Sequence, residues 1–497
     1  MHVVLWDTRR GGATKDFAGG FGVGQYPGTG GIGDRLIRWL MHRDRRPVAL
    51  AYAYLAAIFR RLGHTVEYAV DRLPSGDLCV FHPSLPTLPW ERQAIAQLNE
   101  DQPACRVLVA GIVAHTLPEA FVGLGVTLVR GEVEQLFWKL DDVLEAAWPS
   151  GASGAERSHA PAAVDVGQVA ELDALPRPDW SPLGPRTFRV SYDFSWFPTA
   201  LVQQSRGCAL ACDYCPYIVL EKRTRFREPE NVAAEMAAGM QEHGFQSFKF
   251  RDPLFGLDRT RAMELADRIR RLPRPIQFSI ETRIDLLREE TLRALAAAGL
   301  SSITFGVETP DEATLRQHRR TPTTDSAQRR FIALCRELGI RTVAGFMIGF
   351  PDDTPERIDG VLRYAQSLGP TFANFNVVTP YPGTEFFRQV KPRIAQFDYS
   401  RYSVYTPVLR YGHFTADELA GQLSRCFTKF YFRSRWLQTS GPALWPRLFR
   451  RRAMTATAEP MEEFGRLAEP AAGSKHQGQC AGDQRHDRDA AWRRHAA

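Results

Sequence analysis

Three cysteines, Cys208, Cys212 and Cys215, fall within eight residues and could do chemistry together. Three thiolates at this spacing can bind three irons of a cubane cluster and leave the fourth iron open to chelate a substrate. Gly207 allows the backbone to turn tightly just before the first of them. The structural alternative, a zinc knuckle, needs a fourth Cys or His at close spacing, and the next histidine is His243. The pattern therefore favours an iron–sulfur cluster with an open iron.

The elements that must position these cysteines are strand-like and helical stretches, which alternate from Ala200 onward. Six such units predict a parallel, partly open barrel, a fold whose ligands bind at the C-terminal ends of the strands. The cysteines directly follow the first expected strand, and charged residues stand at three of the other strand ends. The expected strands are 200–205, 247–251, 276–282, 302–308, 341–348 and 372–378.

The motif resembles that of the radical S-adenosylmethionine superfamily, whose cluster loop has the same spacing and an aromatic residue, here Tyr214, before the third cysteine. The resemblance covers about residues 197–391. It implies a 4Fe–4S cluster whose open iron binds the amino and carboxylate groups of S-adenosylmethionine. One electron then breaks a carbon–sulfur bond and yields methionine and a 5′-deoxyadenosyl radical, so the protein's task is placement and the exclusion of water. Further resembling segments are Glu281-Thr-Arg283, Gly306-Val-Glu308-Thr309, 345–351 and 379–384.

The same resemblance implies roles for residues at the strand ends. Glu281, Arg283 and Glu308 are candidates for the ribose hydroxyls and the methionine carboxylate of S-adenosylmethionine, and Tyr214 is a further cofactor contact. Structural ion pairs inside the barrel mouth are the alternative for the three charged residues. The Gly-Gly-Glu element that the superfamily has after its second strand is absent, and Asp252 is the only carboxylate there. The catalytic residues stay unassigned.

Strands and helices also alternate over residues 1–147, which predicts a doubly wound (Rossmann-like), mostly parallel α/β domain. This segment resembles the cobalamin-binding domain that precedes the barrel in one branch of the superfamily. The resemblance implies cobalamin in the crevice beyond the strand ends, against loops at Ser84, Gly111 and Gly131. The Asp-x-His-x-x-Gly motif that supplies a cobalt ligand in some cobalamin proteins is missing; His115 could replace it or cap a loop. The resembling stretches are 47–57, 63–66, 111–119 and 130–134.

A glycine-rich stretch, residues 11–33, follows the first expected strand. Its segment 28–33 matches the dinucleotide fingerprint G-x-G-x-x-G, which belongs directly at the end of a strand, whereas this segment begins roughly twenty residues later. We interpret the stretch as a loop that closes over the corrin or the substrate where the two domains meet.

These patterns divide the chain into five parts. Small residues and prolines between the two α/β segments indicate a linker. A helical, aromatic region follows the barrel, and the last part has no apolar period, which predicts disorder. The expected parts are 1–147 (cobalamin-binding-like domain), 148–192 (linker), 193–391 (radical S-adenosylmethionine partial barrel), 392–452 (helical region) and 453–497 (tail).

Composition restricts the location and the partners. The chain of 497 residues has a net charge of +7, but its Lys and Arg are spread along it, which argues against a nucleic acid partner. Eight cysteines, three of them in one motif, do not resemble a secreted disulfide framework. With no signal peptide pattern and no apolar run of about 18 residues, we expect a cytoplasmic protein without a transmembrane segment. The basic run 447–452 leaves peripheral membrane contact open, against a solvated chain end.

A cobalamin domain before a radical barrel implies that methylcobalamin delivers a methyl group to a carbon that the radical activates. We therefore expect methylation of an unactivated carbon or phosphorus centre in a small metabolite, lipid or natural-product intermediate, with a reducing partner such as flavodoxin or ferredoxin. Cyclisation, ring contraction or oxidation without methyl transfer stays open. So does a noncatalytic cluster- or cobalamin-binding protein. A tRNA methylthiotransferase would need a second cysteine trio, whereas the first domain has only Cys79 and Cys105.

Overall fold

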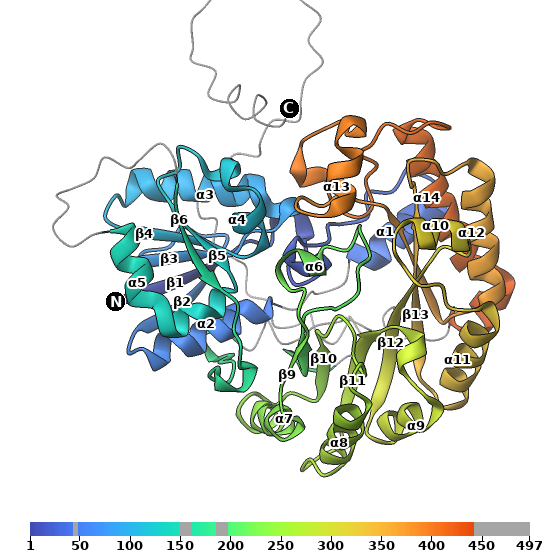
Figure 1. Cartoon of the computed structure of the whole chain (residues 1–497), viewed down its shortest axis with the longest axis horizontal. Coiled ribbons are helices and arrows are strands. Elements are labelled where there is room, and N and C mark those ends of the chain that lie inside the picture. The colour runs from blue at the N-terminus through green and yellow to red at the C-terminus, as the bar shows by residue number, and fades with distance from the viewer. Residues whose placement is uncertain (43–47, 149–160, 185–196, 442–497) are drawn as a thin grey trace, which may run out of the picture.

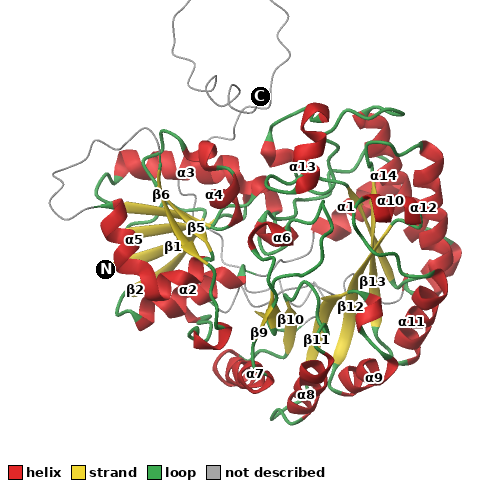
Figure 2. Cartoon of the chain, viewed as in Figure 1, coloured by secondary structure: helices red, strands yellow, loops and turns green. Residues whose placement is uncertain are grey.

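Two six-stranded parallel sheets dominate the computed structural model, which describes residues 1–42, 48–148, 161–184 and 197–441 (Figure 1). In the N-terminal sheet the order is β2-β1-β3-β4-β5-β6. Helices cover both faces (Figure 2), so its inner strands are apolar runs that are buried on both sides. The strands are β1 His2–Asp7, β2 Thr65–Val70, β3 Leu78–Phe81, β4 Arg106–Ala110, β5 Thr127–Gly131 and β6 Ala162–Gly167. The helices are α1 Ile32–His42, α2 Leu50–Arg61, α3 Leu88–Asp101, α4 Ile112–Thr116 and α5 Leu136–Ala147.

The order of this sheet creates a binding crevice. β1 lies between β2 and β3. The chain therefore goes from β1 to β2 on one side of it and then crosses to β3 on the other side, which reverses the strand order at β1. In doubly wound folds ligands bind at such a switch point, beyond the C-terminal strand ends. Here these ends lead into Thr8, His82, Gly111 and Glu132. The expected doubly wound fold is confirmed.

Two elements of this half were missed by the sequence prediction. Strand β6 lies inside the stretch 148–192 that we expected to be a linker, and it pairs with β5. Only Val166 of this strand is buried, so it has no apolar run that could have revealed it. Helix α1 begins within the glycine-rich stretch, whose earlier part contains two short 3₁₀ turns, Arg10–Gly12 and Ala18–Gly20.

The second sheet forms the partial barrel. Its order, β7-β10-β11-β12-β13-β14, follows the chain, every pair is parallel, and β7 and β14 are its open edges. All six expected strands are present, although the first is shorter than expected. The strands are β7 Thr199–Val202, β10 Ser247–Phe250, β11 Gln277–Thr282, β12 Leu300–Glu308, β13 Arg341–Ile348 and β14 Phe372–Val377. The helices are α6 Tyr217–Leu220, α7 Pro229–His243, α8 Arg259–Arg270, α9 Glu289–Ala297, α10 Glu312–Gln317, α11 Asp325–Glu337, α12 Pro355–Leu368 and α13 Glu385–Val390.

A short antiparallel pair, β8 Ser205–Arg206 and β9 Arg225–Phe226, brackets the cysteine motif. After the barrel come α14 Ala416–Tyr431 and α15 Ser434–Thr439. A capping box between Thr415 and Glu418 starts α14. This helix packs on β14 and against α1 from the other half (Figure 1). Each large apolar side chain that it buries contributes about 1.5–3 kcal/mol.

Some predictions fall outside the described residues. These are the basic run 447–452, the tail 453–497 and residues 149–160 and 185–192 of the expected linker. Among the helices that the structure describes, none combines the length and the apolar character needed to cross a membrane.

Candidate functional site

The three cysteines of the motif line one cavity of about 860 Å³ at the C-terminal end of the barrel strands. Cys208 and Cys212 are buried, and Cys215 is partly buried. The backbone N–H of Cys208 donates to the Glu221 carbonyl (2.9 Å), and that of Cys215 donates to the Cys212 carbonyl (3.1 Å). The loop is thereby closed on itself and tied to the end of α6.

Gly207 makes the tight entry to this loop, as expected. Its φ is +89°, and a Cβ there would lie 2.2 Å from the Arg223 carbonyl oxygen. Side-chain-bearing residues avoid this backbone region, and no neighbour could move enough to make room. The position therefore requires glycine.

The cysteine thiols are suited to a metal cluster. Burial raises the pKa of Cys215 to about 12 and also raises that of Cys208, so an incoming metal must displace their protons. Among the described side chains, no three of His, Cys, Asp or Glu converge closely enough to hold a single metal ion. Three thiols that line one cavity could each bind a different iron of a cluster.

A buried pair that the sequence reasoning missed positions the cluster loop. The Asp213 carboxylate, between the second and third cysteines, lies 3.0 Å from Nδ1 of His318, and both side chains are buried. The His318 ring stacks on Phe350 with centroids 4.6 Å apart. Since His318 follows α10, more than a hundred residues away in the chain, only the folded structure reveals this pairing.

Tyr214 lies in the same cavity with an unusual feature. Its ring packs edge-on against Phe350, while its buried hydroxyl has no hydrogen-bond partner among the described residues. Buried hydroxyls are normally paired, and an unpaired one calls for a ligand or a water. Tyr214 therefore has the geometry of a cofactor contact.

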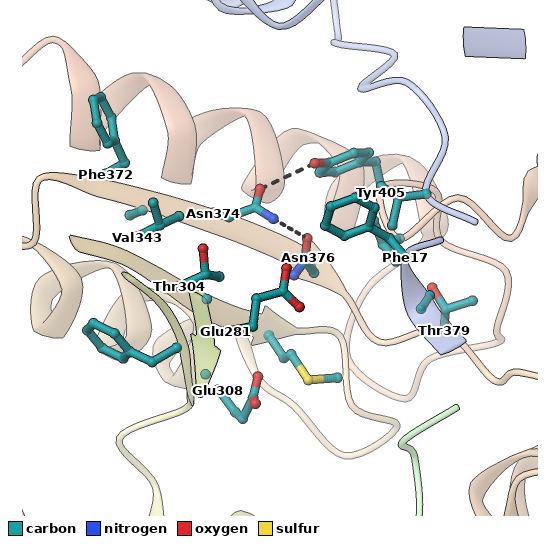
Figure 3. Close-up of a pocket in the computed structure, with 18 of the residues that line it drawn as sticks. Phe17, Glu281, Thr304, Glu308, Val343, Phe372, Asn374, Asn376, Thr379 and Tyr405 are labelled. Carbon is teal, nitrogen blue, oxygen red and sulfur yellow. Dashed lines mark hydrogen bonds between the residues drawn. The ribbon is translucent and has the colours of Figure 1, made fainter. Parts of the chain in front are cut away.

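Glu281 also lines the cavity, from the end of β11. Its carboxylate accepts a hydrogen bond from Nη1 of Arg251 (2.9 Å) and lies 3.3 Å from Nζ of Lys249, both cations being buried. Figure 3 shows Glu281 and Glu308 on neighbouring strands at one end of the cavity, with the hydrogen-bonded group Asn374, Asn376 and Tyr405 across from Glu281.

Glu308 and Arg283 complete the charged end of the cavity. Glu308 has a φ of +65° and stands at a register shift between β12 and β13, a strained backbone of the kind found at functional sites. Burial raises its pKa, although Arg320 lies 3.3 Å away. Arg283 pairs with Asp285 at 2.9 Å. The three predicted residues thus share the cavity, and each also has an ion-pair partner.

Asp252 has a different role. It is fully buried and does not line the cavity; its carboxylate accepts from the Gln204 backbone (3.0 Å) and from the backbone and the hydroxyl of Ser205. It therefore holds the turn between β7 and β8 and does not replace the missing Gly-Gly-Glu carboxylate.

The glycine-rich segment inserts between the two halves. Phe17 lines the barrel cavity, and the Arg251 guanidinium lies 4.0 Å from the centre of its ring while donating to the Asp16 carbonyl. Gly19 has a φ of +62°, and a Cβ there would lie 2.8 Å from the backbone of Pro216, directly after the cluster motif. This segment is thus fitted against the cluster loop.

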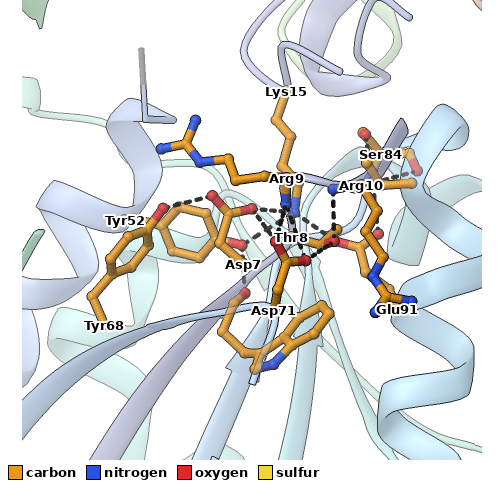
Figure 4. A network of polar contacts seen from close by, with 12 residues as sticks. Asp7, Thr8, Arg9, Arg10, Lys15, Tyr52, Tyr68, Asp71, Ser84 and Glu91 are labelled. Atoms are coloured by element: carbon orange, nitrogen blue, oxygen red, sulfur yellow. Dashed lines mark hydrogen bonds and ion pairs between the residues drawn. The ribbon is translucent and has the colours of Figure 1, made fainter. Parts of the chain in front are cut away.

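A buried polar network anchors the segment to the first sheet (Figure 4). Nζ of Lys15 lies 2.8 Å from Asp7, at the end of β1, and 2.5 Å from Glu91. The Tyr68 hydroxyl donates to Asp7 (2.6 Å). The two carboxylates raise the pKa of Lys15 above its ordinary value, which keeps the buried amine charged.

A second cavity, of about 130 Å³, lies between the halves, and both Gly111 and Gly131 line it, as predicted. Ser84 does not: its hydroxyl bonds to Thr87 at 2.7 Å within a capping box. His115 does not line it either. His82, which the sequence reasoning missed, lines it with a buried Nδ1 that has no partner among the described residues, and burial lowers its pKa to about 4.

Ion pairs join this crevice to the cluster loop. Arg206, immediately before the motif, lies 3.0 Å from Glu134 and also pairs with Glu132, at the end of β5. Arg225 on β9 pairs with Glu132 as well. The loop that carries the cysteines is therefore held by residues of both halves.

Comparison with known proteins identifies relatives of both halves. A family model of the Radical SAM superfamily matches residues 202–365. An uncharacterized methyltransferase of Pyrococcus horikoshii is 26% identical over 62% of this chain and 68% of its own length. An anaerobic magnesium-protoporphyrin IX monomethyl ester cyclase of Cereibacter sphaeroides is 27% identical over 62% of this chain and 51% of its own. The chain thus spans between half and about two thirds of these relatives.

Two solved structures share the fold. The radical S-adenosylmethionine methyltransferase TsrM from Kitasatospora setae, solved with cobalamin and a [4Fe-4S] cluster bound, superposes with a TM-score of 0.57 at 18% identity, over 79% of this chain and 74% of its own. The cobalamin-dependent S-adenosylmethionine radical enzyme OxsB superposes with a TM-score of 0.61 at 13% identity, over 92% and 69%. At these identities the likeness concerns the fold alone.

Proposed function

Residues 202–365 form a radical SAM domain, and from this premise we propose an enzyme that cleaves S-adenosylmethionine to a radical and methylates an unactivated carbon or phosphorus centre. The observation that carries the proposal is the single cavity that brings the three cysteines together with Glu281, Arg283 and Glu308. Its volume of about 860 Å³ lies toward the upper end of small-molecule sites, roughly 300–1,000 Å³.

In this proposal Cys208, Cys212 and Cys215 hold a 4Fe–4S cluster. When bound, the cluster supplies the electron that splits S-adenosylmethionine. Glu281 and Glu308 accept hydrogen bonds from the ribose hydroxyls, and Arg283 pairs with the methionine carboxylate. The unpartnered Tyr214 hydroxyl provides a further polar contact, and the glycine-rich segment excludes water from the cavity.

The same proposal places cobalamin in the crevice of the first sheet. Gly111 and Gly131 have positive φ and offer bare backbone at the strand ends, and neutral His82 presents a free ring nitrogen. When bound, cobalamin supplies the methyl group for transfer. The space of about 130 Å³ is smaller than a corrin, so the crevice would have to widen to admit one. The Ser84 hydroxyl is hydrogen-bonded within the capping box, so the proposal gives it no direct contact with cobalamin.

Radical chemistry without methyl transfer is the second candidate. One relative of comparable identity is named a cyclase, and the fold alone does not separate cyclisation, ring contraction or oxidation from methylation. A noncatalytic cluster or cobalamin carrier is disfavoured by the charged end of the cavity, which a carrier does not need.

The proposal also includes the cellular setting. The seven cysteines in the described part of the chain form no disulfide, which supports a reducing, cytoplasmic location. The substrate would be a small molecule or a lipid and not a nucleic acid, and the electron would come from a reducing partner such as flavodoxin or ferredoxin.

The test uses the full chain, reconstituted anaerobically with iron, sulfide and hydroxocobalamin and then given a reductant and S-adenosylmethionine labelled in its methyl group. If the enzyme transfers methyl groups, we expect bound corrin, a labelled methyl group on that corrin, and S-adenosylhomocysteine. Deoxyadenosine without S-adenosylhomocysteine would transfer the assignment to the second candidate. His82→Ala should weaken corrin binding, whereas His115→Ala, as the matched control, should not.

A further inference from the structure

Among the described residues, the charged side chains of the barrel cavity stand at one end only. The charged residues among its described lining are Glu281, Arg283, Glu308 and Arg320, all close to the cysteines: Arg320 interacts with Cys212 and Glu308 with Cys215. Away from them the lining is mostly apolar and aromatic, apart from Thr304 and the hydrogen-bonded group Asn374, Asn376 and Tyr405. Figure 3 shows Phe372 and Val343 to the left of Asn374, with Thr304 between Val343 and Glu308.

The uncharged part is long. Both Phe372 at the start of β14 and Val377 at its end line the cavity, so it follows this strand for roughly 17 Å at about 3.3 Å per residue. S-adenosylmethionine bound at the cysteine end would leave this part free. A long apolar channel that ends at a radical site fits an elongated hydrophobic substrate.

The channel opens onto an exposed apolar surface. Three residues line the cavity and are nonetheless exposed: Leu36 of α1 (42%), Phe432 just after α14 (41%) and Leu437 of α15 (49%). Ile32 (84%) and Trp39 (41%) extend the surface along α1, at positions i, i+4 and i+7 with Leu36. The two elements adjoin, because a Cβ at Gly33 would lie 3.0 Å from the Phe432 ring. We call these five exposed residues the mouth patch.

The charge around the mouth patch is positive. Arg35 and Arg38 of α1 and Arg435 of α15 are exposed. The carboxylate within α1, Asp34, is buried and accepts hydrogen bonds from Tyr26 and Thr29. An amphipathic helix with Trp, Leu and Ile on one side and Arg beside them is typical of segments that lie in the interface of an anionic bilayer.

We propose that the mouth patch docks on an anionic membrane and that the substrate is a membrane lipid, which enters the channel directly from the bilayer. The choice of a membrane over a protein partner follows from the continuity of the patch with the apolar channel and from its basic rim. This inference rests on the proposed function for the chemistry at the cysteine end, but the docking itself requires no cluster.

Cosedimentation of the full chain with vesicles tests the docking. Phosphatidylcholine vesicles containing phosphatidylglycerol should bind the protein, and pure phosphatidylcholine should bind it far less. The double variant Ile32→Asp/Trp39→Asp should bind at least about tenfold more weakly, since it removes two inserting side chains. The matched control is Trp138→Asp on α5, since Trp138 is 48% exposed and lies on the other half.

A second measurement tests the channel. Binding of cis-parinaric acid, whose fluorescence rises in an apolar site, should weaken about tenfold or more in Leu437→Arg, which places a charge at an exposed lining position. Trp138→Arg should leave it unchanged. Absence of vesicle binding would overturn the proposal. If the wild type is then a dimer that Ile32→Asp/Trp39→Asp dissociates, the mouth patch would be assigned to an interface with a second copy. If the wild type is a monomer, the patch would be assigned to residues 442–497 as its occupant.

The two proposals fail separately. Deoxyadenosine formation by a vesicle-negative wild type would refute the membrane inference while supporting the radical site. Vesicle and parinaric acid binding by a protein that forms no deoxyadenosine would refute the proposed function and leave the docking surface in place.

Discussion

At the scale of single residues, the cluster loop depends on backbone conformation as much as on its cysteines. Gly207→Ala would force a Cβ against the Arg223 carbonyl at a φ of +89°. We expect a loss of about 1–3 kcal/mol in stability and a clear fall in bound iron, because the loop entry must shift. Iron content and denaturant unfolding measure both. Gly360→Ala, inside α12 with open space around it, should change neither adversely.

A second prediction at this scale concerns pH. Burial raises the pKa of Asp252 from 3.8 to about 6. The stability that a protonated Asp252 adds, compared with Asp252→Asn, is therefore fully present below the pKa that Asp252 has in the unfolded chain. It is lost as the pH rises through about 6. At 1.36 kcal/mol per pKa unit the change is about 3 kcal/mol. Denaturant unfolding of both proteins between pH 4 and pH 8 checks it, and a difference that is constant or grows with pH would contradict it.

The residue scale also shows what sequence reasoning reaches. The cysteines and the charged strand ends could be predicted because each follows a recognisable strand in the chain. His318 and His82 could not, because their roles come from partners and cavities that only the tertiary structure assembles. Ser84, also predicted, does not line the crevice, and its hydroxyl is hydrogen-bonded within a capping box.

At the scale of elements, the buried network around Lys15 is what fixes the glycine-rich segment between the cavities. Lys15→Met would leave the Asp7 and Glu91 carboxylates buried without their cation. We expect a loss of about 3–5 kcal/mol and faster proteolysis within residues 11–23. Denaturant unfolding and limited proteolysis measure these effects. Lys222→Met, at an exposed position, is the control, and equal behaviour of the two variants would remove the anchoring role.

The elements also explain where fold prediction succeeded. Several barrel strands alternate buried with half-buried residues, as β13 does, and this period of two can be recognised in the sequence. Edge strand β6 buries only Val166, so it has no apolar run to reveal it. Helix α1 has apolar residues at helical spacing, but it begins inside a glycine-rich stretch that favours a loop.

At the scale of the whole molecule, the two halves act on one site. Arg206 and Arg225 of the barrel half pair with Glu132 at the crevice of the first sheet, next to the loop that carries the cysteines. Phe17 from the first half closes over the barrel cavity. Tyr217 and Pro253 line both the barrel cavity and the crevice where the proposal places cobalamin.

The most direct test of the central claim is the yield of 5′-deoxyadenosine from S-adenosylmethionine by the anaerobically reconstituted, reduced chain. Wild type and Cys335→Ala, which alters a buried cysteine of α11 outside the cavity, should both form it. Cys212→Ala should lose at least about a hundredfold of the activity, since a cluster ligand is gone. Equal yields from Cys212→Ala and wild type, or none from wild type holding four irons per chain, would contradict the account.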